Sequence, residues 1–317
     1  MVRIYSRIPK RSRDVRSETK GGKNLVAHIV LSISHWVAAL AISTPGVVFH
    51  LYSASLGLYL LVSSRLDKKF IGTMILFPMD SVRYFEFDFL WKSIVKRRTL
   101  GDYLDVSSPR LFSLRALKRR RFKSAVLVNP VVDDLRTTER LINACGLSRR
   151  CEFHNCVLEN LESAPSSFDT IVCISVVEHI PGEGDRDAVQ KMWELLRPGG
   201  MLLLSVPCCK DPFEEYIDFN EYGLLTADDE GFVFGQRFYN QETLEERVYC
   251  ITGRPSRFGV YGEIEKGAFE LNRAQKLSGS GYPYWREPYM MGEEYNCFGS
   301  IRELPGWGVT AMEFVKN

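Results

Sequence analysis

The most regular part of the chain reads F-D-T-I-V-C-I-S-V-V-E-H-I over residues 168–180 and L-L-R-P-G-G-M-L-L-L-S-V-P over residues 195–207. Each stretch contains an apolar run of the length of a buried strand, and a charged segment of helical character separates them. Pro198-Gly199-Gly200 ends that helix and turns the chain into the second strand. This order predicts neighbouring parallel strands in a covered sheet, whose carboxyl edge is where such sheets hold a ligand.

The same alternation continues toward the N-terminus as far as about residue 100. We expect strands at 103–106, 125–128, 151–157, 170–174, 201–206, near 259–263 and at 309–315, with helices at 111–122, 133–145 and 186–196. These elements predict a doubly wound α/β domain over residues 70–317. Two long irregular stretches, at about 208–256 and 264–308, are expected to be insertions into it.

These segments resemble the class I S-adenosylmethionine-dependent methyltransferases. In that family Phe168-Asp169 opens the fourth strand, Ser175–His179 forms the loop beneath the cofactor, and Arg197–Gly200 forms the turn into the fifth strand. The resemblance extends more weakly over residues 100–207. It implies a Rossmann-like, mostly parallel seven-stranded sheet, with S-adenosylmethionine as the cofactor.

The cofactor positions implied by the resemblance are chemically unusual in this sequence. Asp105 keeps the acidic position at the end of the first strand, but Ser107, Ser108 and Pro109 stand where the family has glycines. Such glycines let backbone N–H groups approach the ligand. Asn129 stands where an acid usually accepts the ribose hydroxyls, and its amide carbonyl lacks charge assistance.

The remaining site positions follow the third and fourth strands. Cys156 and Val157 match the position that meets adenine and offer apolar contact only. Ser175 and Glu178 are expected to face the cofactor, and His179 is the candidate base for an oxygen acceptor. Glu178 and His179 equally suit a structural role in the loop. The chain is therefore either a divergent methyltransferase or a catalytically inactive methyltransferase-like module that binds a partner at a membrane.

The first insertion suggests the acceptor. Between residues 211 and 240, eight aromatic residues interleave with eight carboxylates. Aromatic faces with carboxylate acceptors suit a sugar-like ring, so O-methylation of a glycan, lipid-linked or small-molecule acceptor is expected. The same composition fits an ordinary lid packed on the sheet. No nucleic acid is expected as a partner, and the absence of G-x-G-x-x-G after any strand argues against a nicotinamide dehydrogenase.

The N-terminal region differs from the rest of the chain. Residues 1–24 are basic and expected to be disordered; residues 1–23 carry eight basic and two acidic residues. Residues 24–64 then contain no Asp, Glu, Lys or Arg, and Thr44-Pro45-Gly46 divides this run. We expect an apolar helical hairpin over 25–69, either in contact with a membrane, with both ends cytosolic, or packed as two buried helices on the domain.

The distribution of charge and the cysteines bear on partners and on the cellular compartment. The net charge is only +2, yet residues 115–123 include six basic side chains, which suit phosphate or lipid headgroups as well as a solvated helix face. The eight cysteines include no C-x-x-C pair, so a metal site is not predicted. Reduced cysteines indicate a cytoplasmic protein, attached to the cytoplasmic face of a membrane if the hairpin inserts.

Overall fold

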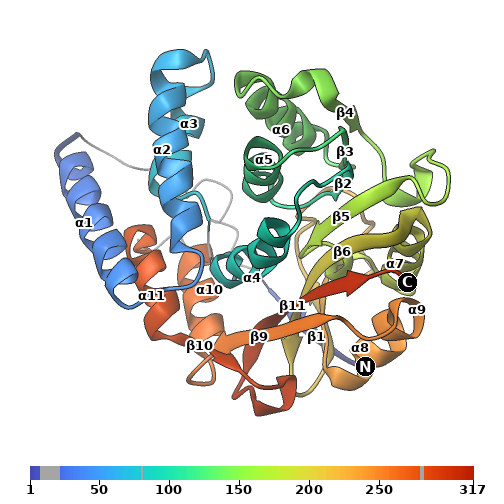
Figure 1. Ribbon diagram of the computed structural model, residues 1–317. Helices are drawn as coiled ribbons and strands as arrows, with labels where there is room; N and C mark the ends of the chain where they lie inside the picture. The colour runs from blue at the N-terminus through green and yellow to red at the C-terminus, as the bar shows by residue number, and fades with distance from the viewer. Residues whose placement is uncertain (8–21, 80, 279–281) are drawn as a thin grey trace.

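The computed structural model describes residues 1–7, 22–79, 81–278 and 282–317. Its centre is an eight-stranded sheet with the order β10-β9-β11-β6-β5-β2-β3-β4 (Figure 1). The strands are β2 (Asp102–Val106), β3 (Ser124–Val128), β4 (Cys151–His154), β5 (Phe168–Ile174), β6 (Leu196–Cys209), β9 (Arg257–Glu263), β10 (Tyr295–Phe298) and β11 (Trp307–Val315). The pairs among β2 to β6 are parallel, and β11 runs antiparallel to β6 and β9. The predicted Rossmann-like sheet is confirmed, and the edge strand β10 adds an eighth strand to the seven expected.

Two apolar cores cover the two faces of this sheet because successive strand residues point to opposite sides. Tyr103 belongs to the core beneath α4 (Arg83–Lys96) and α5 (Arg110–Arg119), whereas its neighbour Leu104 belongs to the core beneath α7 (Gly184–Leu195). The near-continuous apolar strands of the sequence are therefore buried on both sides, as in other parallel sheets. The expected helix at 133–145 is α6 (Val132–Ala144), which begins at an N-cap, Val131, without a capping side chain.

The uncharged N-terminal segment folds into α1 (Gly22–Ala41) and α2 (Val47–Ser63), followed by α3 (Lys68–Leu76). Gly46 joins the first two helices with a φ of 71°, and a Cβ there would overlap the Tyr84 carbonyl, so only glycine fits. The Arg115 guanidinium of α5 lies 4.0 Å from the Phe49 ring centroid and attaches α2 to the domain. Among the described helices, none is both long and apolar enough to cross a bilayer.

A second, three-stranded sheet has the order β1-β7-β8, formed by β1 (Val2–Ser6), β7 (Phe213–Ile217) and β8 (Val233–Phe238). The expectation of disorder at the very N-terminus is wrong for residues 2–6, which pair in parallel with β7. The Tyr5 ring stacks on Tyr216 at 5.2 Å, which stabilises this pairing. The remaining tail, residues 8–21, lies outside the described part of the chain.

The second half of the chain contains short helices between its strands. They are α8 (Gln241–Leu244), a π-helical turn (Glu245–Tyr249), α9 (Cys250–Thr252), α10 (Ala268–Ser278) and α11 (Glu287–Glu293). The expected strand at 151–157 ends at His154, because Asn155 turns back toward the preceding strand: its Nδ2 donates to the Asn129 carbonyl at 2.9 Å. This early end leaves Cys156 and Val157 in a loop.

Candidate active site

The carboxyl ends of the parallel strands meet at one edge of the sheet, and every predicted site residue lies in or follows one of these ends. Asp105, Ser107 and Ser108 lie at the end of β2; Asn129 follows β3; Cys156 and Val157 follow β4; Ser175, Glu178 and His179 follow β5. The strands predicted from the sequence pattern thus place these residues at one edge of the sheet. Their individual environments differ, and decide what each can do.

The loop after β2 keeps the backbone course of a glycine turn although serines replace the glycines. Ser107 has a φ of 50°, in the left-handed region that favours glycine. Asp105 is buried and holds the loop by accepting a hydrogen bond from Ser108 N at 2.8 Å and another from the Ser113 hydroxyl. Burial raises the pKa of Asp105 to about 6, and these hydrogen bonds oppose that rise.

The Ser108 side chain is committed to the sheet. Its Oγ donates to the Val172 carbonyl at 3.2 Å and accepts a hydrogen bond from Ile174 N at 3.1 Å. A serine therefore bridges the ends of β2 and β5. The family's glycine at this turn has no side chain to do so.

The expected ribose and adenine positions are more loosely built. Asn129 Oδ1 accepts a hydrogen bond from Val131 N at 2.8 Å, so the carbonyl expected to face a ribose hydroxyl is used by its own loop. Val157 is exposed and Cys156 is half-buried. This end of the edge offers backbone and apolar surface, together with the amide NH₂ group of Asn129.

Helix α4 contributes an acid that sequence reasoning missed. Glu86 is 0% exposed, and its Oε1 accepts hydrogen bonds from Ser175 Oγ at 2.5 Å and from Ser205 Oγ at 2.7 Å. Its Oε2 pairs with Arg83 at 2.6 Å. The carboxylate therefore lies between the ends of β5 and β6. The only sequence signal was a charged residue inside the aromatic run R-Y-F-E-F-D-F-L-W of residues 83–91.

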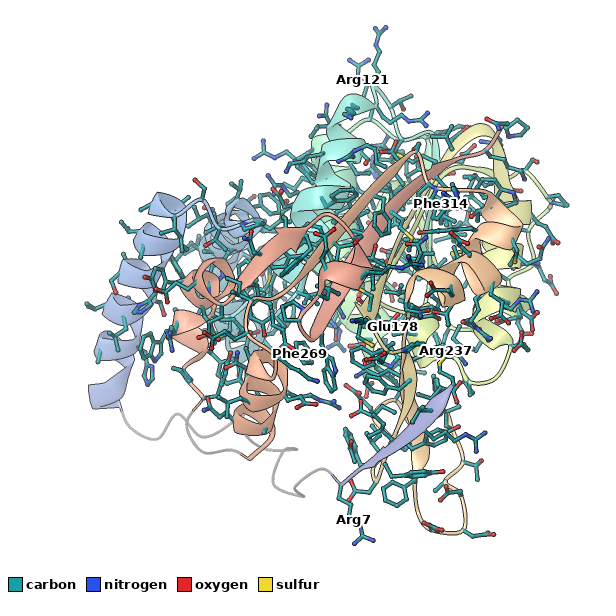
Figure 2. The ribbon with its side chains drawn as sticks, turned by 90° about the horizontal axis from the view of Figure 1, so that it is seen from below. Arg7, Arg121, Glu178, Arg237, Phe269 and Phe314 are labelled. Atoms are coloured by element: carbon teal, nitrogen blue, oxygen red, sulfur yellow. The ribbon has the colours of Figure 1, made fainter. Side chains whose placement is uncertain are left out.

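Glu178 lies close to this acid. It is 2% exposed, and among the described atoms its Oε2 has no hydrogen-bond partner. Figure 2 shows Glu178 well inside the molecule. Burial raises its pKa to about 8; the charge of Arg83 opposes this rise, while that of Glu86 adds to it. With Asp105 included, three buried carboxyl groups line the edge, an arrangement that suits a cationic ligand group.

His179 is held in one tautomer. Its Nδ1 lies 2.6 Å from the Gly235 carbonyl, so Nδ1–H donates and Nε2 carries the lone pair. Nε2 lies 3.5 Å from the Tyr222 hydroxyl, and the two rings meet edge to face at 5.2 Å. Burial lowers the pKa of His179 to about 4, which keeps the imidazole neutral near pH 7. Tyr222 and Gly235 both belong to the first insertion, which therefore reaches the candidate base.

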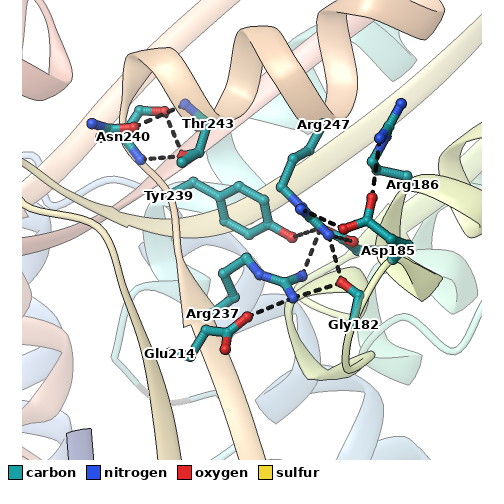
Figure 3. Close-up of polar contacts among 10 residues, drawn as sticks. Gly182, Asp185, Arg186, Glu214, Arg237, Tyr239, Asn240, Thr243 and Arg247 are labelled. Carbon is teal, nitrogen blue, oxygen red and sulfur yellow. Dashed lines mark hydrogen bonds and ion pairs between the residues drawn. The ribbon is translucent and has the colours of Figure 1, made fainter. Parts of the chain in front are cut away.

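A buried ion network fixes that insertion to the loop carrying the histidine (Figure 3). Arg237 of β8 is 1% exposed and pairs with Asp185 at 2.7 Å and with Glu214 at 2.9 Å. Arg247 pairs with the other oxygen of Asp185 at 2.6 Å and donates to the Gly182 carbonyl. Arg237, Arg247 and Glu214 of the insertion thus hold this cover in place.

Comparison with known proteins agrees with the fold. The family described as "Methyltransferase domain" matches residues 105–200. No curated protein sequence matches the chain. Solved structures similar to it include the MccD protein, at 10% identity and a TM-score of 0.48 over 74% of this chain and 96% of the other. Coclaurine N-methyltransferase is 16% identical, with a TM-score of 0.45 over 73% of this chain and 69% of the other. Geranyl diphosphate C-methyltransferase from Streptomyces coelicolor is 8% identical, with a TM-score of 0.46 over 73% of this chain and 78% of the other.

All three TM-scores lie below 0.5, so the resemblance to the family depends on the sequence match and the strand order. The match begins at Asp105, the acid at the end of β2, and ends at Gly200, the last residue of the turn before the apolar part of β6. It spans the carboxyl-edge loops described above. Together these findings confirm that the chain resembles the class I S-adenosylmethionine-dependent methyltransferases, a family that uses S-adenosylmethionine as its methyl donor.

Proposed function

We propose that the chain is an S-adenosylmethionine-dependent methyltransferase that acts on a hydroxyl group of a small-molecule or glycan acceptor. One observation carries the proposal: His179 is held neutral, with Nδ1 bound to Gly235 and Nε2 directed toward Tyr222. A fixed tautomer with a lone pair at the ligand edge of the sheet is what a general base requires.

The residues at the edge fit the cofactor. S-adenosylmethionine, when bound, supplies a methyl group on a positively charged sulfur beside a charged amine. Asp105, Glu86 and Glu178 would hold this cationic portion, since they are buried and Glu178 Oε2 has no partner among the described atoms. With its pKa raised to about 8, the Glu178 carboxyl is protonated near pH 7, and a cation bound beside it would favour the ionised form. The left-handed backbone at Ser107 lets the loop follow the family's course.

The acceptor would lie between His179 and the insertion. His179 Nε2 accepts the proton of the acceptor hydroxyl, while the Gly235 carbonyl keeps the imidazole in the required tautomer. The Tyr222 ring covers the histidine, and the network around Asp185 holds the insertion in place, which limits access of water. Orientation and proton acceptance are the protein's two contributions to such a transfer.

A second candidate function, a methyltransferase-like module without catalysis, is favoured by a different observation. The Ser108 hydroxyl, the Asn129 carbonyl and the Glu86 carboxylate all have partners within the protein. If these contacts persist, little polar surface is left for a nucleoside. The module would then bind a partner through another face.

Isothermal titration of the full-length chain with S-adenosylmethionine separates the two candidates. If the chain is an enzyme, we expect a dissociation constant for S-adenosylmethionine in the micromolar to sub-millimolar range. Asp105→Asn should weaken binding at least about tenfold, because it removes the charge at the end of β2. Asp187→Asn, at an exposed position of α7, is the matched control and should bind normally.

Transfer of a labelled methyl group to a panel of hydroxylated small molecules and oligosaccharides then identifies the acceptor class. No heat of binding at millimolar cofactor, from a chain that melts cooperatively, would rule out the enzyme and leave the module.

A further inference from the structure

A cluster of arginines lies at the amino edge of the sheet, away from the candidate active site. Arg98, Arg119, Arg120 and Arg121 line a cavity of about 290 Å³. Figure 2 shows Arg121 reaching out from the molecule, well away from Glu178. Within the described ranges, no carboxylate forms an ion pair with any of the four guanidinium groups. Four unpaired guanidinium groups around one cavity form a site for an anion.

The orientation of Arg120 strengthens this assignment. Its Nη2 donates to the Val95 carbonyl at 3.1 Å, which fixes the side chain. Its Nε is buried and has no partner among the described atoms. The fixed side chain keeps the Arg120 guanidinium at the cavity, where its other N–H groups can donate to an anion.

An apolar helix face adjoins the cavity. The Arg119 guanidinium lies 5.8 Å from the Tyr52 ring centroid, and Lys118 Nζ lies 5.8 Å from the Tyr59 ring centroid. Both tyrosines belong to α2, where Tyr59 is 58% exposed and Val62 is 85% exposed. Continuing along the same helix, Arg65 is exposed just beyond its end. Basic and apolar side chains thus form one continuous surface, which we call the α2–arginine face.

This apolar exposure is not needed for folding. The inner side of α2 is already buried through residues such as Phe49 and Leu60, and the Arg115 guanidinium stacks on that side. The outer side nevertheless carries apolar rather than charged residues. The neighbouring helix α1, which stands at the same side of the molecule in Figure 1, adds further exposed apolar side chains. They are Val30, Ile33, Val37 and Leu40. Exposed apolar patches of this kind mark interaction surfaces.

We propose that the α2–arginine face docks on the surface of an anionic phospholipid bilayer. The arginines bind headgroup phosphates, for which planar guanidinium groups are well suited, and the outer side chains of α2 enter the interfacial layer. A soluble phosphorylated ligand would use the arginines but leave the apolar side without a partner. A second copy of the chain would bring its own arginines against these, at a cost in repulsion. A bilayer offers phosphates to the arginines and an apolar layer to the outer side chains of α2. The helices would lie on the bilayer surface and not cross it.

Co-sedimentation of the full-length chain with vesicles tests this proposal. We expect binding to vesicles of phosphatidylcholine with phosphatidylglycerol and little binding to phosphatidylcholine alone. A double variant, Arg119→Glu with Arg121→Glu, should raise the lipid concentration for half-binding at least about tenfold. Val62→Asp should have a similar effect, since it places a charge in the apolar half. Lys210→Glu, which reverses one basic charge at an exposed position after β6, is the control and should bind like the wild type.

Circular dichroism and thermal melting establish that each variant is folded. The proposal is overturned if the wild type ignores anionic vesicles. It is also overturned if inorganic phosphate at millimolar concentration displaces the protein while Val62→Asp binds normally, because the ligand is then a soluble anion. Sedimentation velocity tests the remaining alternative. If the wild type is a dimer and Val62→Asp is a monomer, the face binds a second copy of the chain and the proposal is overturned. Cofactor binding at the other edge is measured separately, so neither outcome depends on the proposed methyl transfer.

Discussion

Ser205 Oγ donates a hydrogen bond to Glu86 Oε1 at 2.7 Å, joining residues 119 positions apart in the sequence. This bond ties helix α4 to β6 at the carboxyl edge of the sheet, and the same oxygen accepts from Ser175 Oγ. Helix α4 is thus built into the candidate active site. The other side of α4 packs against α2, where the Phe49 and Phe87 rings lie 5.1 Å apart.

Glu86→Gln tests whether this carboxylate serves a cationic cofactor. We expect the affinity for S-adenosylmethionine to fall about tenfold, or ~1.4 kcal/mol, because glutamine keeps the hydrogen-bond shape but removes the charge. The affinity for S-adenosylhomocysteine, whose sulfur is neutral, should change far less. Titration calorimetry with both ligands measures this ratio, with the exposed Glu162→Gln as control. Equal losses for the two ligands would show that Glu86 acts through structure alone, and tighter binding would show that it blocks the site.

Because Glu178 is buried, we expect the stability of the folded chain to fall as the pH rises. Its pKa is raised from 4.5 to about 8 in the folded chain, so the folded state holds the proton more tightly than the unfolded state. This contribution to the free energy of unfolding is fully present below about pH 4.5 and is lost as the pH rises through about 8. Urea unfolding between pH 5 and pH 8.5 should show a decline of up to a few kcal/mol.

Glu178→Gln supplies the comparison, since an amide cannot ionise. The decline should become shallower in this variant. The contribution of Asp105, whose pKa is raised to about 6, remains, while His179, whose pKa is lowered from 6.5 to about 4, contributes in the opposite direction below about pH 6.5. An unchanged slope would mean that Glu178 is ionised in the folded chain at neutral pH. A bound cation should also lower the pKa of Glu178, so cofactor binding near pH 7 should release protons, which calorimetry in two buffers detects.

His179→Ala should separate catalysis from cofactor binding. Loss of a general base lowers the rate of methyl transfer by about 10²- to 10⁴-fold, whereas the dissociation constant of S-adenosylmethionine should stay within about twofold. The pKa of His179 lies at about 4, so protonation of this residue should not reduce the wild-type rate between pH 8 and pH 6. Tyr222→Phe, which removes a hydroxyl 3.5 Å from Nε2, is a milder control. A rate in His179→Ala equal to that of the wild type would contradict the assignment of the base.

Much of the fold was predictable because its signals are local. Apolar runs and glycine turns located β2 to β6, and the resemblance correctly placed Asp105, Asn129 and His179 at strand ends. The strand at 2–6 was missed because its pairing partner lies more than 200 residues away, and a short basic segment carries little strand signal of its own. For the hairpin, length and flanking charge left contact with a membrane and packing on the domain both open, and the inner side of α2 supplies buried contacts with the domain.

The site was less predictable for a related reason. Whether a polar side chain faces a ligand or its own backbone depends on rotamers and loop geometry, which composition does not reveal. Asn129 bonds to its own loop and Ser108 bridges two strands, although both occupy ligand positions in the family pattern. In the sequence, nothing distinguishes Glu86 from the other polar residues of its aromatic helix, or Ser205 from its neighbours in an apolar strand. Only tertiary packing brings them together with Ser175.

The buried acid Asp185 offers a direct test of how the insertion is held over the histidine. Although burial would raise its pKa, hydrogen bonds from Arg247 and the charge of Arg237 hold the pKa of Asp185 below its usual value. Asp185→Asn leaves these two arginines without their shared counter-charge, and breaking such a buried pair costs about 3–5 kcal/mol. Urea unfolding should show this loss, while the exposed Asp187→Asn should stay within about 0.5 kcal/mol of the wild type. Because β8 carries both Arg237 and the Gly235 carbonyl, loosening this strand should also weaken the bond to His179 Nδ1. The imidazole should then become more exposed, and its pKa, followed by NMR, should rise from about 4 toward 6.5. A loss of stability with no change in the histidine titration would show that the ion network supports the fold without positioning the base.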